Sequence, residues 1–265
     1  MKKIYACLHR TALSVFLCTF FLFGFAEKKQ HGEFYRLTVY HFKDGSQEKV
    51  LDNYLQSALL PALHRRGFEK IGVFKPLAND TAADKLVYVL IAFKAVQQIA
   101  ELPGQLLTDN GYVTAGKEYI DAVYKAPSYN RMENIILHAF RLALQMQMPQ
   151  LSSSPSEKIY ELRSYESATE KIFQNKVTMF NEGGEIPLFK RLGFNAVFYA
   201  EVIAGSHQPN LMYMTSFENM QQHDAHWKAF VDDPEWKKLS ADPVYQNNVS
   251  HIDITLMHAT AYSDY

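Results

Sequence analysis

The sequence predicts an α+β fold in which two tandem copies of one small unit close into a single barrel. Three matches at nearly constant spacing predict this duplication. The stretch LPALHRRGF, residues 60–68, returns as IPLFKRLGF at residues 186–194, an offset of 126. YRLTVY from Tyr35 matches YELRSY from Tyr160 at offset 125, and LVYVLIAF from Leu86 matches LMYMTSF from Leu211. Near the ends of the copies, LHAF from Leu137 matches MHAT from Met257 at offset 120.

The first copy defines the elements of the unit in order. Apolar and polar residues alternate in FYRLTVYHF, residues 34–42, as in a strand. Apolar residues at helical spacing over 50–63 predict a helix, and Gly67 is placed for a left-handed residue after its end. We then expect strands at 68–75 and 86–93, a helical region and a strand at 133–140. This order is that of the ferredoxin-like unit, an antiparallel sheet with helices on one face.

The second face of each such sheet carries apolar side chains and needs a cover. If the two copies pack face to face, they form a pseudo-dimer, a closed α/β barrel with its helices outside. Two independent domains, or sheets that pair with another chain in a homo-oligomer, are the alternatives.

The N-terminal segment has the pattern of a secretory signal peptide. A basic start precedes the apolar run 11–26, which ends in Gly-Phe-Ala, so we expect cleavage after Ala26 and a periplasmic or secreted protein. A retained signal anchor is the alternative. The predicted organisation is a signal peptide at 1–26, a first repeat at 33–147, a linker at 148–157 and a second repeat at 158–265.

Charge and motifs exclude several classes of function. Removal of residues 1–26 takes away Lys2, Lys3, Arg10 and both cysteines, and leaves a net charge near −4. This charge argues against nucleic-acid partners, and no later apolar run is long enough to span a membrane. No nucleotide-binding loop or serine-hydrolase elbow is found.

Three stretches resemble the NIPSNAP family: YELRSYES from Tyr160, IPLFKRLGF from Ile186 and FVDDPEWKKL from Phe230. The resemblance covers nearly all of the second copy and, more loosely, the first. It implies a dimeric α/β barrel. The wider superfamily includes cofactor-free monooxygenases, haem-processing enzymes and isomerases, which is an analogy of fold only.

The family's E-x-R-x-Y strand supplies the candidate ligand-binding residues. It corresponds here to Glu161, Arg163 and Tyr165, and the first copy has Arg36 and Tyr40 at matching positions. If the alternate residues of these strands, Tyr35, Leu37, Tyr160 and Leu162, pack under the helices, the polar set faces the barrel interior.

Two roles are open for this polar set. Arg163 would anchor an anionic or carbonyl oxygen that Tyr165 and Tyr40 orient, and Arg163→Ala would then abolish binding but leave the fold intact. Alternatively, Glu161 and Arg163 only satisfy each other.

The histidines give little support for a metal site. His223 and His226 share a helix face, but no third ligand follows from the sequence, so we expect packing histidines beside Trp227 and no metal. Trp227, Phe230 and Trp236 have the spacing of helix anchors, and Asp233-Pro234 that of a helix start.

The leading interpretation is an exported protein that binds a small organic ligand in a polar-lined barrel cavity without a tightly held cofactor. Whether it is an enzyme, and by which catalytic residues, stays open. A protein-interaction module with a filled barrel is the alternative, and haem or metal handling is a third class.

Overall fold

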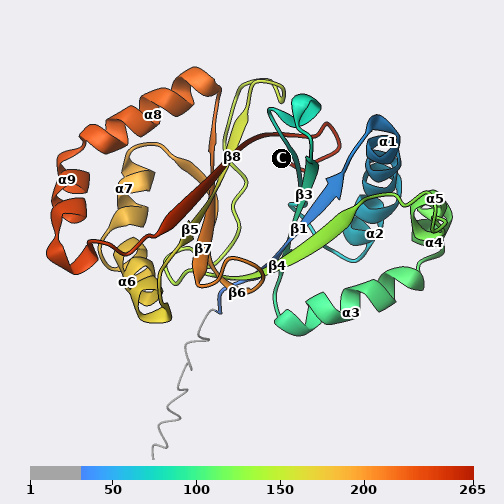
Figure 1. Cartoon of the computed structure of the whole chain (residues 1–265), viewed down its shortest axis with the longest axis horizontal. Coiled ribbons are helices and arrows are strands. Elements are labelled where there is room, and N and C mark those ends of the chain that lie inside the picture. The colour runs from blue at the N-terminus through green and yellow to red at the C-terminus, as the bar shows by residue number, and fades with distance from the viewer. Residues whose placement is uncertain (1–30) are drawn as a thin grey trace, which may run out of the picture. The chain divides into compact units, whose positions relative to one another are not determined.

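The computed structural model describes residues 31–265 (Figure 1). The predicted signal peptide, residues 1–26, lies outside the described residues. Within those residues, no helix is both long enough and apolar enough to cross a membrane.

Each half of the described chain contributes four strands and several helices. The first half comprises β1 (Phe34–Phe42), α1 (Gly45–Tyr54), a π-helical segment (Leu55–Leu59), α2 (Leu60–Arg65), β2 (Gly72–Pro76), β3 (Lys85–Phe93), α3 (Val96–Leu107), α4 (Asn110–Ala115), α5 (Lys117–Ile120) and β4 (Arg131–Ala139). The second half comprises β5 (Ile159–Glu166), α6 (Glu170–Asn181), α7 (Glu185–Arg191), β6 (Asn195–Ala204), β7 (Asn210–Phe217), α8 (Met220–Asp232), α9 (Pro234–Ala241) and β8 (His251–Ala259). Short 3-10 turns lie at Asn79–Thr81 and Pro243–Tyr245.

The strands form one closed antiparallel barrel in the order β1-β3-β2-β8-β5-β7-β6-β4. Two contacts, β2 with β8 and β4 with β6, join the halves. The predicted single barrel is therefore confirmed, and the alternative of two independent domains is wrong. The helices lie outside the barrel, on either side of the strands (Figure 1).

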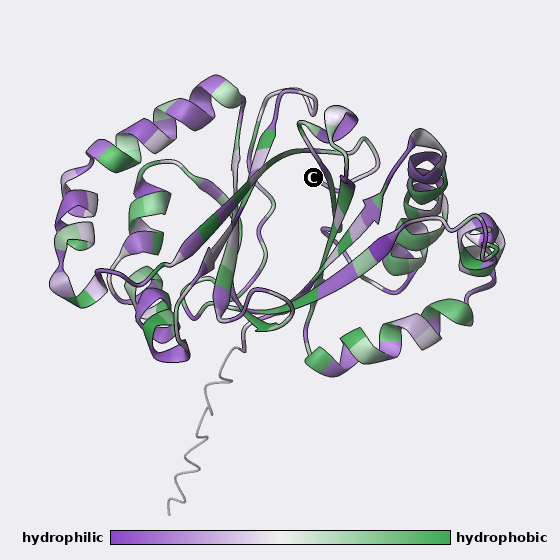
Figure 2. Cartoon of the chain, viewed as in Figure 1, coloured by the Kyte–Doolittle hydropathy of each residue, from purple (hydrophilic) through white to green (hydrophobic). Residues whose placement is uncertain are grey.

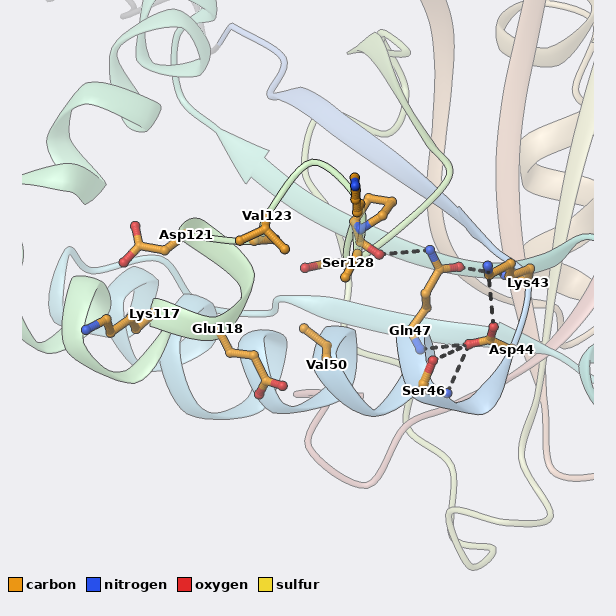
Figure 3. Close-up of a pocket in the computed structure, with 14 residues that line it drawn as sticks. Lys43, Asp44, Ser46, Gln47, Val50, Lys117, Glu118, Asp121, Val123 and Ser128 are labelled. Atoms are coloured by element: carbon orange, nitrogen blue, oxygen red, sulfur yellow. Dashed lines mark hydrogen bonds and ion pairs between the residues drawn. The ribbon is translucent and has the colours of Figure 1, made fainter.

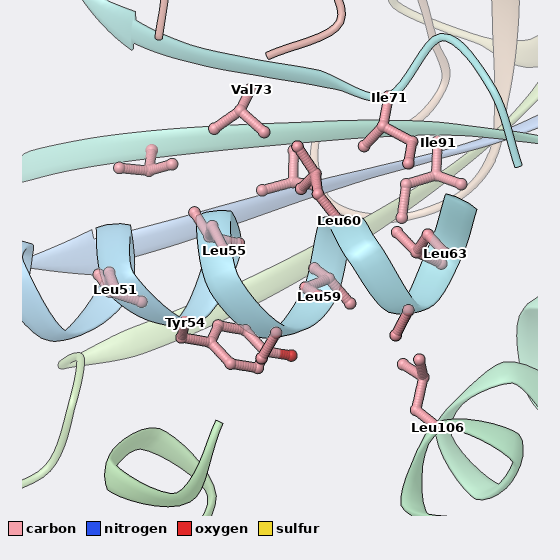
Figure 4. Close-up of a cluster of buried hydrophobic side chains, with 14 of the residues drawn as sticks. Leu51, Tyr54, Leu55, Leu59, Leu60, Leu63, Ile71, Val73, Ile91 and Leu106 are labelled. Atoms are coloured by element: carbon pink, nitrogen blue, oxygen red, sulfur yellow. The ribbon is translucent and has the colours of Figure 1, made fainter. Parts of the chain in front are cut away.

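Three apolar clusters fill this architecture. One lies between the strands of the first half and their helices, where Figure 4 shows helix residues such as Leu60 and Leu63 gathered with Val73 and Ile91. A second cluster lies under α6, α7 and α8. The third fills the barrel interior. Hydrophobic and hydrophilic residues are interspersed along the helices in Figure 2, as expected where only one helix face is covered.

The predicted facing of the strand residues is wrong. Tyr35, Leu37, Tyr160 and Leu162 pack inside the barrel, whereas Tyr40 and Tyr165 pack under the helices. Both faces of a helix-covered barrel are enclosed, so both take apolar side chains and alternation alone does not tell them apart. The polar set consequently lies in the layers between sheet and helices.

The two repeated stretches are equivalent helix ends. Gly67 and Gly193 have φ of +78° and +77°. The N–H of the following phenylalanine bonds back to the helix in each case, Phe68 to the Leu63 carbonyl at 3.1 Å and Phe194 to the Phe189 carbonyl at 3.0 Å. The expected left-handed position of Gly67 is confirmed.

The strand registers correct one of the predicted matches. Leu37 lies opposite Leu90 on β3, and its counterpart Leu162 lies opposite Met214 on β7. The third strands therefore correspond at offset 124, so the match of Leu86 with Leu211 is one residue out. A slip of one residue exchanges the two faces of a strand, and similarity in an apolar run does not detect it.

The two ends of the barrel differ. At one end, the C-terminal Tyr265 packs on Phe74 and Tyr160, with ring centroids 5.5 and 6.1 Å apart, and Met146 joins the interior cluster. The other end is where β1 and β5 finish and β3, β4, β7 and β8 begin. It holds the pocket described next.

Candidate functional site at the barrel mouth

A pocket of about 340 Å³ opens at this second end of the barrel, and we refer to it as the mouth pocket. Its volume lies at the lower end of the range of small-molecule sites. Both halves of the chain supply its walls, which are formed by Val39, His41, Leu86, Tyr88, Glu133, Ile135, Leu162, Ser164, Ser206, His207, Asn210, Met212, Asp253, Ile254 and Thr255.

The floor of the mouth pocket is apolar. Val39, Ile135 and Leu162 belong to the interior cluster, and Met212 packs against it. Below them the barrel is filled, since Leu37, Leu137 and other side chains of that cluster are 0 % exposed. The pocket is thus a cup at one end of the barrel and not a channel through it.

Asn210 supplies the most site-like polar group. Its side chain is 1 % exposed, and its Nδ2 donates a hydrogen bond to Ser164 Oγ at 2.9 Å. The Oδ1 atom on the other side of the amide has no hydrogen-bond partner among the described residues. Buried carbonyl oxygens are nearly always paired, so an orphan in a pocket wall suggests a missing donor or cation.

Tyr88 is a neutral phenol at the pocket wall. Burial raises the pKa of Tyr88, and the carboxylates of Glu133, Asp253 and Asp84 raise it further, while its hydrogen bond with Thr255 acts in the opposite direction. Its hydroxyl can therefore donate or accept a hydrogen bond at any ordinary pH.

Histidine and carboxylate pairs surround the rim. His41 Nδ1 lies 2.7 Å from Asp84 Oδ2, and its Nε2 lies 3.6 Å from Glu133 Oε1. On the other side, His207 Nδ1 lies 2.7 Å from Glu166 Oε1. No lysine or arginine is among the described residues of the pocket wall. The local field is acidic and favours a neutral or cationic ligand over an anion.

The predicted site residues of the second half lie elsewhere and bind one another. Arg163 donates from Nε to Glu161 Oε1 at 2.7 Å and from an η nitrogen to the Tyr165 hydroxyl at 3.3 Å. Trp227 Nε1 donates to Glu161 Oε2 at 2.6 Å, and the Arg163 guanidinium lies over the Trp227 ring. Glu161 is 1 % exposed. These contacts favour the internal network over ligand anchoring, because both carboxylate oxygens are occupied.

Arg36 and Tyr40 lie in the other helix-covered layer. Tyr40 belongs to the cluster under α1 to α4, and Tyr165 to the one under α6 to α8. The two tyrosines therefore do not form one site, and their predicted joint role is wrong. The Arg36 Nε is buried without a hydrogen-bond partner among the described residues. Burial lowers the pKa of Arg36, and the nearby hydroxyls of Tyr40, Tyr54 and Tyr112 oppose this shift.

The two predicted packing histidines have the expected environment. His223 and His226 both lie against the Phe217 ring, at centroid distances of 4.9 and 5.7 Å. His223 Nε2 also lies 3.3 Å from Glu161 Oε2. The helix start at Asp233-Pro234 is confirmed, because Asp233 accepts from the N–H of Glu235 at 2.8 Å as the N-cap of α9.

A larger hollow of about 840 Å³ lies between the start of α1 and the segment after α5 (Figure 3). Two of its polar side chains are held by hydrogen bonds within the protein. Gln47 Nε2 donates to the Pro127 carbonyl at 2.9 Å, and Asp44 accepts the N–H groups of Ser46 and Gln47 as the cap of α1. Ser128 Oγ in its wall is also unpaired among the described residues. We place the candidate site at the smaller mouth pocket, because it combines an apolar floor with the more deeply buried Oδ1 of Asn210, a residue that is 1 % exposed against 5 % for Ser128.

Sequence reasoning missed the mouth pocket almost entirely. Ser164 and Asn210 come from the paired strands β5 and β7, and Tyr88 comes from β3 of the other half, which faces them only when the barrel closes. A usable signal was present: polar residues such as Ser164 continue the interior face of a strand whose other members, Tyr160 and Leu162, are apolar. Such a change of polarity along one face marks the strand end that is open to solvent.

The fold is shared with solved structures of low sequence identity. A candidate monooxygenase from Lactobacillus acidophilus NCFM superposes with a TM-score of 0.56 at 9% identity, covering 86% of this chain and 94% of that chain. One from Fusobacterium nucleatum gives 0.54 at 7% identity, with 86% and 93% covered. An anthrone oxidase-like protein gives 0.50 at 9% identity, with 88% and 92% covered. No curated protein matches the chain in sequence.

These similarities and the strand order define the class: a mixed α/β protein built on a barrel of the dimeric α/β type. Residues 160–264 match the NIPSNAP family model. The second half of the chain is thus a NIPSNAP domain, as the sequence resemblance predicts.

Proposed function

We propose that the protein binds a compact neutral or cationic organic ligand in the mouth pocket. The observation that carries this proposal is the unpaired Oδ1 of Asn210, which is buried in the wall of a pocket with an apolar floor. A ligand hydroxyl or amine would complete it, while Tyr88 and Ser164 offer further hydrogen bonds. An anion is disfavoured by the surrounding carboxylates.

We extend this proposal to chemistry that uses no tightly held cofactor. Barrels of the same fold include the candidate monooxygenases and the anthrone oxidase-like protein. Their similarity supports testing a neutral aromatic ligand first. Turnover, if present, would be oxidation of such a ligand by dioxygen. The filled middle of the barrel favours the second candidate function, an interaction module, if no ligand binds.

A titration with anthrone, whose enol tautomer has a hydroxyl that can donate to Asn210 Oδ1, tests the proposal by ligand-observed NMR. Met212 packs at the pocket floor, so Met212→Trp fills the cavity and should weaken binding more than tenfold. Met220→Trp is the matched control, because Met220 is 37% exposed at the start of α8. Equal binding to both variants would place the ligand elsewhere. Measuring oxygen uptake in the presence of anthrone distinguishes an enzyme from a protein that only binds the ligand.

Arg36 supports a separate proposal in the first half. The Arg36 guanidinium lies near tyrosine hydroxyls, and its buried Nε has no partner among the described residues. This group would therefore bind a small anion. Titration with acetate or phosphate should show binding that Arg36→Met abolishes. A thermal midpoint that rises in Arg36→Met, with no anion effect in the wild type, would instead identify a merely unfavourable buried charge.

We further propose that the chain is a duplication of one ferredoxin-like unit and that it is exported after cleavage at Ala26. Two observations support the duplication: the helix caps at Gly67 and Gly193 are equivalent, and the strands of the two halves follow the same order in the barrel. Residues 158–265 expressed alone should then form dimers, because their interior face is uncovered. The intact mass of the protein from its source cell tests the second point.

A further inference from the structure

The rim of the mouth pocket brings together three side chains from separate segments. Glu166 ends β5, His207 lies in the loop between β6 and β7, and Asp253 lies on β8. One donor atom from each lies within 4.8 Å of the others. Since β8 and β7 both pair with β5, the pairing of neighbouring strands within the second half brings these side chains together.

The charge of this cluster is unbalanced. His207 Nδ1 lies 2.7 Å from Glu166 Oε1, and His251 Nε2 lies 3.1 Å from Asp253 Oδ1. Among the described residues, neither carboxylate forms an ion pair with a lysine or arginine. With a neutral imidazole, the three groups carry a net charge of −2, which a divalent cation balances.

The unpaired oxygen of Asn210, which also carries the ligand proposal, supports a cation at this place. It lies directly opposite Glu166 in the ladder between β5 and β7. It lines the same pocket as His207 and Asp253. The side chain is 1 % exposed, and its unpaired Oδ1 lies on the amide's free side, because Nδ2 is held by Ser164. A carbonyl oxygen in this position is an additional ligand or an acceptor for metal-bound water.

We propose that Glu166, His207 and Asp253 bind a divalent first-row transition metal ion at the rim of the mouth pocket. One imidazole and two carboxylates suit Zn²⁺, Mn²⁺ or Fe²⁺ better than Mg²⁺ or Ca²⁺, which prefer oxygen ligands alone. Nδ1 of His207 is the ligand atom, so the ring proton is on Nε2. Three protein ligands leave coordination positions open toward the pocket.

The geometry requires only small side-chain movements. Ligands at the usual 2.0–2.2 Å from a tetrahedral ion lie about 3.3 Å apart. The present spacing of the donor atoms, 2.7 Å for one pair and at most 4.8 Å overall, brackets this value. His207 and Asp253 are 59 % and 54 % exposed at their side chains, so both are free to rotate.

The histidine on the opposite rim does not offer a comparable site. His41 contacts Asp84 through Nδ1 and Glu133 through Nε2. The two ring nitrogens point in divergent directions, so these carboxylates cannot share one ion with the ring. The proposal therefore concerns only the side of the rim formed by β5, β7 and β8.

Titration of tag-free, chelator-treated protein with Co²⁺ and Zn²⁺ tests the proposal without any organic ligand. We expect one ion per chain, a visible Co²⁺ absorption band and a higher thermal midpoint with Zn²⁺. His207→Ala and Asp253→Asn should each weaken binding at least tenfold. His64→Ala is the matched control, since His64 Nε2 pairs with Asp264 Oδ2 at 3.0 Å on the protein surface, away from this site.

Three outcomes overturn the proposal: the absence of saturable binding, binding that His207→Ala leaves unchanged, and equal weakening in His64→Ala. Circular dichroism shows whether each variant is folded. If His207→Ala fails to fold, the decision rests on Asp253→Asn, because Asp253 is half exposed and its replacement removes one charge with little change of shape. The metal alone is the probe, so the result is independent of the ligand proposal.

Discussion

The guanidinium carbon of Arg163 lies 3.6 Å from the centroid of the Trp227 ring, and both side chains bind the carboxylate of Glu161. This arrangement connects β5 to α8. It uses the charged residues of the E-x-R-x-Y strand to attach a helix to the barrel, in a layer where an unpaired charge would be very unfavourable.

Arg163→Ala should consequently destabilise the fold. It leaves Glu161 buried and short of its cation, and we expect a loss of about 3–5 kcal/mol in the free energy of unfolding. Arg191→Ala is the control, because Arg191 pairs with Asp233 at 2.9 Å while 46 % exposed, and the loss from an exposed pair is much smaller. Denaturant titration measures both. Similar losses would show that the buried network is no stronger than a surface pair.

The buried pair of Lys176 and Glu185, 2.8 Å apart, should make stability depend on pH. Burial raises the pKa of Glu185 above its ordinary 4.5, although Lys176 opposes this shift. Between 4.5 and the raised pKa, the folded state binds more protons than the unfolded state, so stability falls as the pH rises through that window. Unfolding free energies from pH 4 to 8 should show this slope in the wild type, and Glu185→Gln should lack it. If the unfolding free energy of Glu185→Gln depended on pH in the same way as that of the wild type, Glu185 would not be the source of the slope.

The two helix ends allow a matched comparison. Alanine at either glycine is strained by the positive φ, at a cost of about 1–2 kcal/mol. At Gly67 an added Cβ meets nothing within 4 Å, whereas at Gly193 it meets His226 Cε1 at 3.3 Å. Gly193→Ala should therefore lower the thermal midpoint more than Gly67→Ala. The reverse order would mean that His226 moves aside freely.

Glu218 holds the linker between the halves to the end of β7. Its carboxylate accepts the N–H groups of Ser152 at 2.9 Å and Ser153 at 2.7 Å, and it also accepts the Ser153 hydroxyl. These hydrogen bonds lower the pKa of Glu218 to about 2, with the Ser153 hydroxyl as the largest cause. The stabilisation of the fold by these hydrogen bonds is present above pH 4.5 and is lost as the pH falls toward 2 and Glu218 becomes protonated.

Glu218→Gln should accordingly accelerate hydrogen exchange at Ser152 and Ser153 at neutral pH. Glu182→Gln, at a side chain that is 63 % exposed, is the control. Exchange that is equally slow in both variants would show that other contacts hold the linker.

Local sequence signals predicted the elements of the fold well. The strand at 34–42 and the cap at Gly67 depend on neighbouring residues, and the internal repeat indicated one barrel. Which face of each strand points into the barrel was not predictable in the same way. Tyr35 and Tyr40 differ in which enclosed layer they enter, and both layers are apolar, so the pattern carries no information on the choice.

The candidate site was harder still to predict. Glu161 and Arg163 were predicted as site residues because they match the E-x-R-x-Y strand of the family that the sequence resembles, yet they satisfy each other. Asn210 and His207 look ordinary in the sequence. Their importance depends on a hydrogen-bond acceptor left unpaired and on atoms brought close by strands far apart in the chain.

The position of β8 also makes the whole ring of strands depend on a short stretch of residues. Its residues 257–259 pair with 74–76 of β2, and this contact is the seam that completes the ring of strands. A polypeptide that stops before residue 251 lacks that seam, the wall contributed by Asp253 and the packing of Tyr265 on Phe74 and Tyr160. A premature stop codon at position 257 would leave the ring of strands open, although it removes only nine of the 265 residues.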